Sequence, residues 1–154
     1  MKQSGKFSAV LLSVALLVGS AASPGIQCVS AQVFAPLPDS TTIVPPDPAL
    51  PPDLRAFSGK WSGSWEGMLD HILVVEEITP KEATFVYAWG TCPAWNIREP
   101  GWVRVKGTLE DGALRASLPN GAAVTYTLTS DGKLSGTYSF RGRISRAQMT
   151  KVVE

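Results

Sequence analysis

The chain has 154 residues, of which 44% are hydrophobic and 18% are charged, and its formal net charge is +1. This length and composition are typical of one globular domain. A nucleic-acid-binding protein normally carries a strong basic excess, so the nearly neutral balance argues against that class.

The first 31 residues have the three-part pattern of a secretory signal peptide. Lys2 and Lys6 give a basic start, residues 7–18 are apolar and uncharged, and small residues follow. The apolar stretch is shorter than the roughly 20 residues that a membrane-spanning helix needs. We therefore expect export, to the periplasm or out of the cell, and no transmembrane span in the mature chain.

Two cleavage points fit this pattern, after Ala22 or after Ala31, and the second is preferred. Cleavage after Ala31 removes Cys28 and leaves Cys92 as a single thiol. Cleavage after Ala22 keeps both cysteines, which an oxidising compartment would allow to form a disulfide. A lipid anchor on Cys28 is a third option, although the residues before it match lipoprotein signals poorly.

Residues 32–56 are rich in proline and separate the signal from the domain. Proline fixes φ and donates no backbone hydrogen bond, so we expect neither a helix nor a central strand here. The segment is interpreted as a flexible linker. Composition does not distinguish a polyproline spacer that holds the domain away from a surface from a disordered tail.

Residues 57–154 predict an all-β domain, because short segments alternate apolar and polar residues and none has helical periodicity. Turns at residues 111–112, 120–121, 131–132 and 141–142 each contain glycine and divide the second half into hairpins. The predicted strands cover residues 60–66, 71–78, 82–89, 102–109, 113–118, 123–128, 133–140 and 143–152. The irregular pattern of the last one indicates a β-bulge.

Each predicted strand has one apolar face. Eight such strands in sequence order bury those faces best as a closed, antiparallel up-and-down barrel. A barrel of this size has an interior that side chains just fill, or that holds one small ligand. Residues 90–101 form an irregular connection inside the domain and are the expected functional loop.

Aromatic residues give the strongest functional signal in the domain. On inward strand faces they either fill the core or line a ligand pocket, and Gly63 and Gly136 on those faces are expected to leave room. Trp95 and Trp102 flank the irregular loop and also suit an exposed platform for a sugar ring or a protein. The candidate ligand-binding residues are Trp61, Trp65, Tyr87, Trp89, Trp95, Trp102, Tyr126 and Tyr138.

Catalytic and metal-binding residues are scarce. His71 is the one histidine, and neighbours on a strand point to opposite faces, so Asp70 does not orient it. We expect His71 to be a surface or hydrogen-bonded residue. Cys92 has Arg98 as its nearest activating group in sequence. A metal site needs three or four convergent ligands, more than this chain offers. We therefore expect no metal site, and we assign no catalytic residue and no cofactor.

The first strand and the strand order resemble the calycin superfamily, which includes lipocalins and avidins. Gly59-Lys60-Trp61 matches the Gly-x-Trp motif that begins strand one of lipocalins, in which an arginine from the last strand packs across the tryptophan. Arg146 is the matching candidate, and such a contact contributes about 0.5–2 kcal/mol. The chain lacks the lipocalin C-terminal helix and a matching set of avidin biotin contacts. The resemblance therefore implies a calycin-like fold and no binding residues.

These observations predict an exported, non-catalytic β-barrel that binds a small apolar or aromatic ligand at the end where Trp95 lies. The alternative is an interaction module on a proline-rich tether, which recognises a glycan or a protein partner through Trp95 and Trp102. A hydrolase-type enzyme is the third hypothesis. Exposure of the tryptophans to solvent distinguishes the first two.

Overall fold

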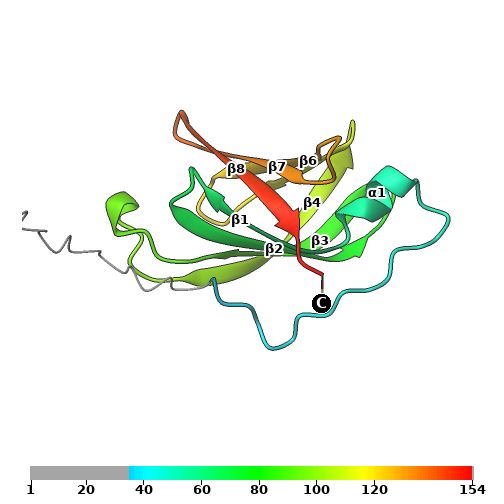
Figure 1. Cartoon of the computed structure of the whole chain (residues 1–154), viewed down its shortest axis with the longest axis horizontal. Coiled ribbons are helices and arrows are strands. Elements are labelled where there is room, and N and C mark those ends of the chain that lie inside the picture. Colours follow the sequence, from blue (N-terminus) through cyan, green and yellow to red (C-terminus); the bar gives the residue numbers. More distant parts are fainter. Residues whose placement is uncertain (1–34, 154) are drawn as a thin grey trace, which may run out of the picture. The chain divides into compact units, whose positions relative to one another are not determined.

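A computed structural model describes residues 35–153 of the chain. Eight antiparallel strands in sequence order form a closed barrel, because the last strand also pairs with the first (Figure 1). The strands are β1 (Gly59–Trp65), β2 (Leu69–Ile78), β3 (Glu82–Trp89), β4 (Gly101–Glu110), β5 (Ala113–Ser117), β6 (Ala123–Leu128), β7 (Leu134–Phe140) and β8 (Arg143–Lys151). The predicted all-β, up-and-down barrel is confirmed. The predicted signal peptide, including Cys28, lies outside the described residues.

Glycine turns join most of the strands. Both central residues have positive φ at Glu66-Gly67, Asp111-Gly112 and Arg141-Gly142, which is the type I′ geometry that suits the twist of a hairpin. At Asn120-Gly121 and Asp131-Gly132 only the glycine has positive φ, and its N–H donates to the carbonyl three residues earlier. All four predicted turns exist, two of them are longer than a two-residue loop, and the turn at Glu66-Gly67 was not predicted.

A short helix, α1 (Pro52–Phe57), covers one end of the barrel, and the β3–β4 connection with the 3₁₀ turn η1 (Pro93–Trp95) lies at the other end (Figure 1). The interior is filled at the α1 end. Phe57 of α1 and Trp61 of β1 are each 1% exposed, and the Trp61 indole N–H donates to the Phe57 carbonyl over 2.9 Å. This half of the barrel is a packed core that holds α1 in place.

The cation that stacks on Trp61 is Lys151. Its Nζ lies 5.1 Å from the centre of the Trp61 ring and donates to the Ala56 carbonyl over 3.0 Å. The expectation that Arg146 has this role is wrong. Arg146 directly precedes Ala147, whose side chain is buried, so strand alternation turns the Arg146 side chain outward, whereas Lys151 pairs with Trp61 in the β1–β8 register.

Gly63 and Gly136 do not leave room for a ligand. A Cβ at Gly136 would lie 3.1 Å from the rings of both Trp65 and Tyr126, and a Cβ at Gly63 would lie 2.9 Å from the Met149 side chain. Neighbouring side chains therefore already occupy the space that these glycines provide. The glycines serve the packing of the barrel interior, which corrects the expectation from the sequence.

The proline-rich residues 35–51 lie against the outside of the barrel. Apolar side chains of this segment pack on the outer faces of β2 and β3; the cluster consists of Ala35, Leu37, Ile72, Val74, Val86 and Ala88. This arrangement differs from the flexible linker expected for residues 32–56. Residues 52–57 also form α1, because a proline at the first helical position lacks only an N–H that the helix does not use.

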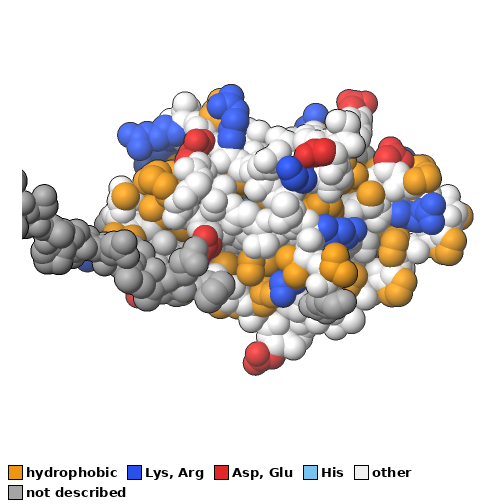
Figure 2. All heavy atoms as spheres, in the orientation of Figure 1, with side chains coloured by type: hydrophobic (Ala, Val, Ile, Leu, Met, Phe, Trp, Pro, Cys, Tyr) orange, Lys and Arg blue, Asp and Glu red, His pale blue; other side chains and the backbone are white. Residues whose placement is uncertain are grey.

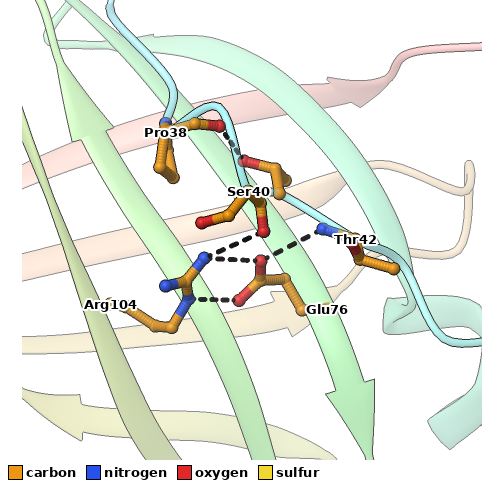
Figure 3. A network of polar contacts seen from close by, with 6 residues as sticks. Pro38, Ser40, Thr42, Glu76 and Arg104 are labelled. Carbon is orange, nitrogen blue, oxygen red and sulfur yellow. Dashed lines mark hydrogen bonds and ion pairs between the residues drawn. The ribbon is translucent and has the colours of Figure 1, made fainter.

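A polar network fastens this segment to the barrel (Figure 3). Arg104 of β4 makes a bidentate ion pair with Glu76 of β2, with distances of 2.7 and 3.0 Å. The same groups bind the segment, because Arg104 donates to the Ser40 carbonyl and the Thr42 N–H donates to the Glu76 carboxylate. The Glu76 carbonyl accepts a further bond, 2.7 Å long, from the N–H of Val44.

A β-bulge makes this last bond available. The β2–β3 register shifts between Val75 and Glu77, which leaves Glu76 without a partner on β3. A bulged residue drops out of the strand ladder, so its backbone is available to another segment. The predicted bulge in the last strand is absent, since the pairings of β8 with β7 and with β1 run without a register shift.

We expect Arg104→Met to loosen the segment without unfolding the barrel. The Glu76 side chain is 9% exposed, so removal of its cation leaves a poorly solvated carboxylate beside the segment. Hydrogen exchange at the Thr42 and Val44 amides should become several-fold faster, while exchange within β3 stays the same. Arg115→Met, which removes an exposed pair with Glu110, is the matched control. Unchanged exchange at Thr42 and Val44 in Arg104→Met would show that the ion pair does not hold the segment.

Candidate ligand-binding pocket

The barrel interior is hollow at the end away from α1, where it contains a cavity of about 490 Å³. Sites for small molecules usually measure about 300–1,000 Å³. The ends of three hairpins, β1–β2, β5–β6 and β7–β8, and the irregular β3–β4 connection build its wall. The lining residues are Trp65, Leu69, Tyr87, Trp89, Trp95, Ile97, Val103, Leu118, Pro119, Asn120, Tyr138, Phe140 and Ser145.

Trp89 is held in the wall by the strand opposite it. A Cβ at Gly101 would lie 2.6 Å from the Trp89 ring, so glycine allows the indole to lie directly against the backbone of β4. The Trp89 N–H donates to the Glu99 carbonyl over 3.2 Å, and Tyr87 lies 6.0 Å away, centroid to centroid. Substitution at Gly101 would therefore move this wall.

The irregular loop contributes Trp95 and Ile97 to the cavity. A pair of backbone hydrogen bonds between Cys92 and Ile97, with Asn96 in the left-handed conformation (φ 58°), closes the loop around η1. The loop that was expected to be functional thus lies in the wall of the cavity. Cys92 itself is buried (4% exposed), and the Arg98 side chain donates to Asn96. The Cys92 thiol therefore has no position from which to attack a ligand in the cavity.

His71 lies beneath the cavity in a stack of aromatic rings. Its centroid is 5.1 Å from that of Trp65 and 4.4 Å from that of Tyr87, and the residue is fully buried. His71 Nδ1 lies 2.8 Å from the Ala88 carbonyl, which can only accept, so Nδ1 carries the proton. Nε2 then accepts from the Tyr126 hydroxyl, also at 2.8 Å. Of the two placements expected for His71, surface or hydrogen-bonded, the second is correct.

Burial governs the ionisation of this stack. It lowers the pKa of His71 from 6.5 to about 4, against a smaller raising effect of the hydrogen bond with the Ala88 backbone. It also raises the pKa of Tyr126 well above its ordinary value. Both groups are therefore neutral at pH 7, and both ring nitrogens of His71 are engaged, so His71 is not available as a general base.

Trp65, Tyr87 and Tyr138 bring polar groups to the aromatic lining of the cavity. The indole N–H of Trp65 is shielded from solvent and has no partner of full hydrogen-bond geometry among the described residues, although it lies close enough to the Tyr87 hydroxyl to act on its pKa. Burial raises the pKa of Tyr87, a hydrogen bond from the Trp65 N–H acts against this rise, and the charge interaction with Tyr138 adds to it. The Tyr138 hydroxyl accepts from Asn120 Nδ2 over 3.0 Å and thus keeps its own proton to donate.

Charged side chains take no part in the lining. Within residues 35–153 no three His, Cys, Asp or Glu side chains are placed to hold a metal ion. In the same part of the chain no helix has the length and apolar character needed to span a bilayer. On the face shown in Figure 2, acidic and basic side chains are interspersed. The cavity thus offers apolar contact and a few uncharged polar groups.

The eight candidate residues separate into three groups. Trp65, Tyr87, Trp89, Trp95 and Tyr138 line the cavity. Trp61 and Tyr126 lie elsewhere in the buried core. Trp102 is 41% exposed and faces outward, beside Arg104, because Val103 takes the inward position of β4. The structure therefore brings Trp95 but not Trp102 to the cavity.

Several lining residues were not predicted from the sequence. Leu69, Val103 and Phe140 lie at strand ends on inward faces, so their alternation with polar neighbours is a signal that was available. Leu118 continues the inward alternation of the predicted strand 113–118, whereas Pro119 and Asn120 belong to the turn that follows, where no periodicity applies. The position of these two turn residues follows only from the closure of the barrel.

Comparison with protein-family models, with curated proteins and with solved structures found no match for this chain.

Proposed function

We propose that this protein is a non-catalytic binding protein that holds a small, neutral, aromatic or apolar ligand in the cavity at the open end of the barrel. One observation carries the proposal: a cavity of about 490 Å³ with an aromatic and aliphatic lining and no charged side chain. Such a lining favours burial of apolar surface, with a few polar groups to fix the orientation. The two candidate catalytic groups, His71 and Cys92, are both buried and do not line the cavity.

A neutral fluorescent dye, N-phenyl-1-naphthylamine, tests the proposal together with two tryptophan variants. Trp95→Ala removes part of the cavity wall and is expected to weaken dye binding about tenfold, equivalent to about 50 Å² less buried apolar surface. Trp102→Ala is the matched control, because Trp102 faces outward, and it should bind the dye like the unchanged protein. Absence of dye binding to the unchanged protein would end the proposal.

The second candidate function is an interaction module that recognises a glycan or a protein partner. It now depends on Trp102, because Trp95 faces the cavity. Acrylamide quenching separates the two proposals. If the cavity binds the dye, bound dye should shield Trp89 and Trp95, and the fraction of tryptophan fluorescence that acrylamide quenches should fall. A surface module loses partner binding in Trp102→Ala with no change in dye affinity.

We further propose a relationship to the calycin superfamily and export from the cell. The first rests on the up-and-down order of eight strands, the Gly59-Lys60-Trp61 start of β1 and a cation from β8, here Lys151, over Trp61. The second rests on the sequence of residues 1–31 alone. Mass spectrometry of the mature chain tests export, since cleavage after Ala22 or Ala31 and a lipid on Cys28 give different masses.

A further inference from the structure

We infer that the open end of the barrel docks on an anionic lipid surface, through the arginines of the β7–β8 hairpin and the exposed apolar side chains of Ile144 and Met68. This inference goes beyond the proposed function, because it concerns the outer rim of the barrel and not the interior. It follows from three properties of that end: unpaired positive charge, exposed apolar side chains and the mouth of an apolar cavity.

The β7–β8 hairpin concentrates positive charge. Three of the seven arginines of the chain, Arg141, Arg143 and Arg146, fall within six residues that contain no acidic residue. All three are exposed, and none of them forms an ion pair among the described residues. Arg141 lies over the Phe140 ring, 5.0 Å from its centre, a contact that does not compensate its charge. Figure 2 shows basic side chains around the end of this hairpin.

One acidic residue, Glu66 of the neighbouring β1–β2 turn, lies beside the hairpin. Its carboxylate accepts from the Arg146 backbone N–H over 2.6 Å, and its own N–H donates to the Arg146 carbonyl. These bonds hold the β1–β2 turn against β8. Three arginines against one glutamate leave the two adjoining hairpin ends with an excess of positive charge, while Arg98 and Glu99 of the irregular loop offset each other.

Exposed apolar side chains lie at the same two hairpin ends. Ile144 is 56% exposed and Met68 is 52% exposed. Ser145 lines the cavity, so strand alternation turns Ile144 outward. The hairpin continues past the last β1–β8 pair, Trp65 with Ala147, and projects from the barrel (Figure 1). Peripheral membrane binding grows with the buried apolar area and with attraction to anionic lipids, and this end of the barrel offers both.

A lipid surface fits this end better than a soluble polyanion or an acidic protein. A polyanion uses the arginines alone and leaves Ile144 and Met68 in water. A stable protein interface buries about 800 Å² of well-packed surface on each partner, whereas these apolar side chains are single residues on two turns. The cavity opens at the same end, with Trp95 and Phe140 half-buried in its wall. Docking here lets an apolar ligand pass from the bilayer to the cavity with little exposure to water.

Co-sedimentation with phosphatidylcholine vesicles, with and without one third phosphatidylglycerol, tests the inference. Residues 7–18 are apolar and can bind lipid by themselves, so each comparison is made between variants with the same N-terminus. The unchanged protein should prefer the anionic vesicles. The double variant Arg141→Gln/Arg143→Gln should bind them about 30-fold less tightly. Arg115→Gln/Lys133→Gln removes the same charge from β5 and the β6–β7 turn and, as the matched control, should bind like the unchanged protein.

Ile144→Ser distinguishes a bilayer from a soluble polyanion. It should weaken vesicle binding about tenfold, equivalent to about 50 Å² less buried apolar surface, and circular dichroism checks that each variant is folded. Paramagnetic broadening locates the contact. In anionic bicelles that contain a gadolinium-chelating lipid, the amide signals of residues 66–68 and 141–146 should broaden, and those of α1 should stay sharp.

The outcomes decide the inference without the cavity. Equal binding of all variants, no preference for anionic vesicles, or broadening centred on α1 would overturn it. Full binding by Ile144→Ser with loss in the arginine variant would also overturn it, because the contact would then depend on charge alone. None of the substituted residues lines the cavity, so vesicle binding and dye binding can fail independently of each other.

Discussion

Between pH 6.5 and pH 4 the free energy of unfolding is expected to fall by about 3 kcal/mol through His71 alone. The folded state holds His71 neutral with a pKa of about 4, whereas in the unfolded chain His71 takes up a proton near its ordinary pKa of 6.5. Below pH 6.5 the unfolded state therefore binds a proton that the folded state excludes. Stability is lost as the pH falls through this window, and the loss levels off below pH 4.

Urea unfolding at a series of pH values measures this effect. The chain contains one histidine, so His71→Gln removes the titrating group completely. The variant should be less stable at pH 7, because the Ala88 carbonyl and the Tyr126 hydroxyl lose their imidazole partner. Its stability should nevertheless be nearly flat between pH 6.5 and 4.5. An equally steep loss in this variant would mean that carboxylates, and not His71, control the acid response.

Much of the fold was predictable because its determinants are local. Alternation of apolar and polar residues placed all eight strands within two residues at every boundary, and the largest difference is at the start of β2, which begins at Leu69. Glycine in the turns fixed the hairpin order, and that order alone allows closure of β8 onto β1. Each of these signals is read from a few consecutive residues.

The packing of the proline-rich segment was not predictable in this way. Its attachment depends on Glu76 and Arg104, which lie on different strands, and on a bulge that exposes one backbone carbonyl. Neither the ion pair nor the bulge has a local signature in the sequence. The proline content correctly excluded a central strand in this segment. It did not indicate which surface of the barrel the segment packs against.

The sequence predicted which residues of the candidate site face the barrel interior, but not where along the barrel axis each of them lies. Trp61 and Trp65 share one face of β1, so alternation assigns both to the interior. One lies in the packed end under α1 and the other at the cavity, and only the position along the barrel axis separates them. Trp95 and Trp102 were expected to form an exposed platform together, but only Trp102 faces outward, because Val103 takes the inward position at the start of β4 and Trp95 lies at the cavity.

Trp61→Ala tests this division of the interior into a filled half and a hollow half. The substitution deletes a fully buried indole, removes the donor of the Phe57 carbonyl and uncovers Lys151. Loss of such a side chain typically costs about 3–5 kcal/mol, so the urea midpoint, followed by far-ultraviolet circular dichroism, should fall strongly. Trp61→Phe keeps a ring in place and should lose less.

Ligand affinity should not follow stability in these variants. Trp61 takes no part in the cavity lining, so the folded fraction of Trp61→Ala should bind N-phenyl-1-naphthylamine as tightly as the unchanged protein. Trp95→Ala should bind the dye about tenfold less tightly and should lose less stability than Trp61→Ala. The opposite pattern, with affinity lost at Trp61 and kept at Trp95, would place the ligand at the α1 end. Both variants delete the same type of side chain, an indole, from the same domain. Any difference in dye affinity between them therefore reports the position of the deleted residue within the barrel.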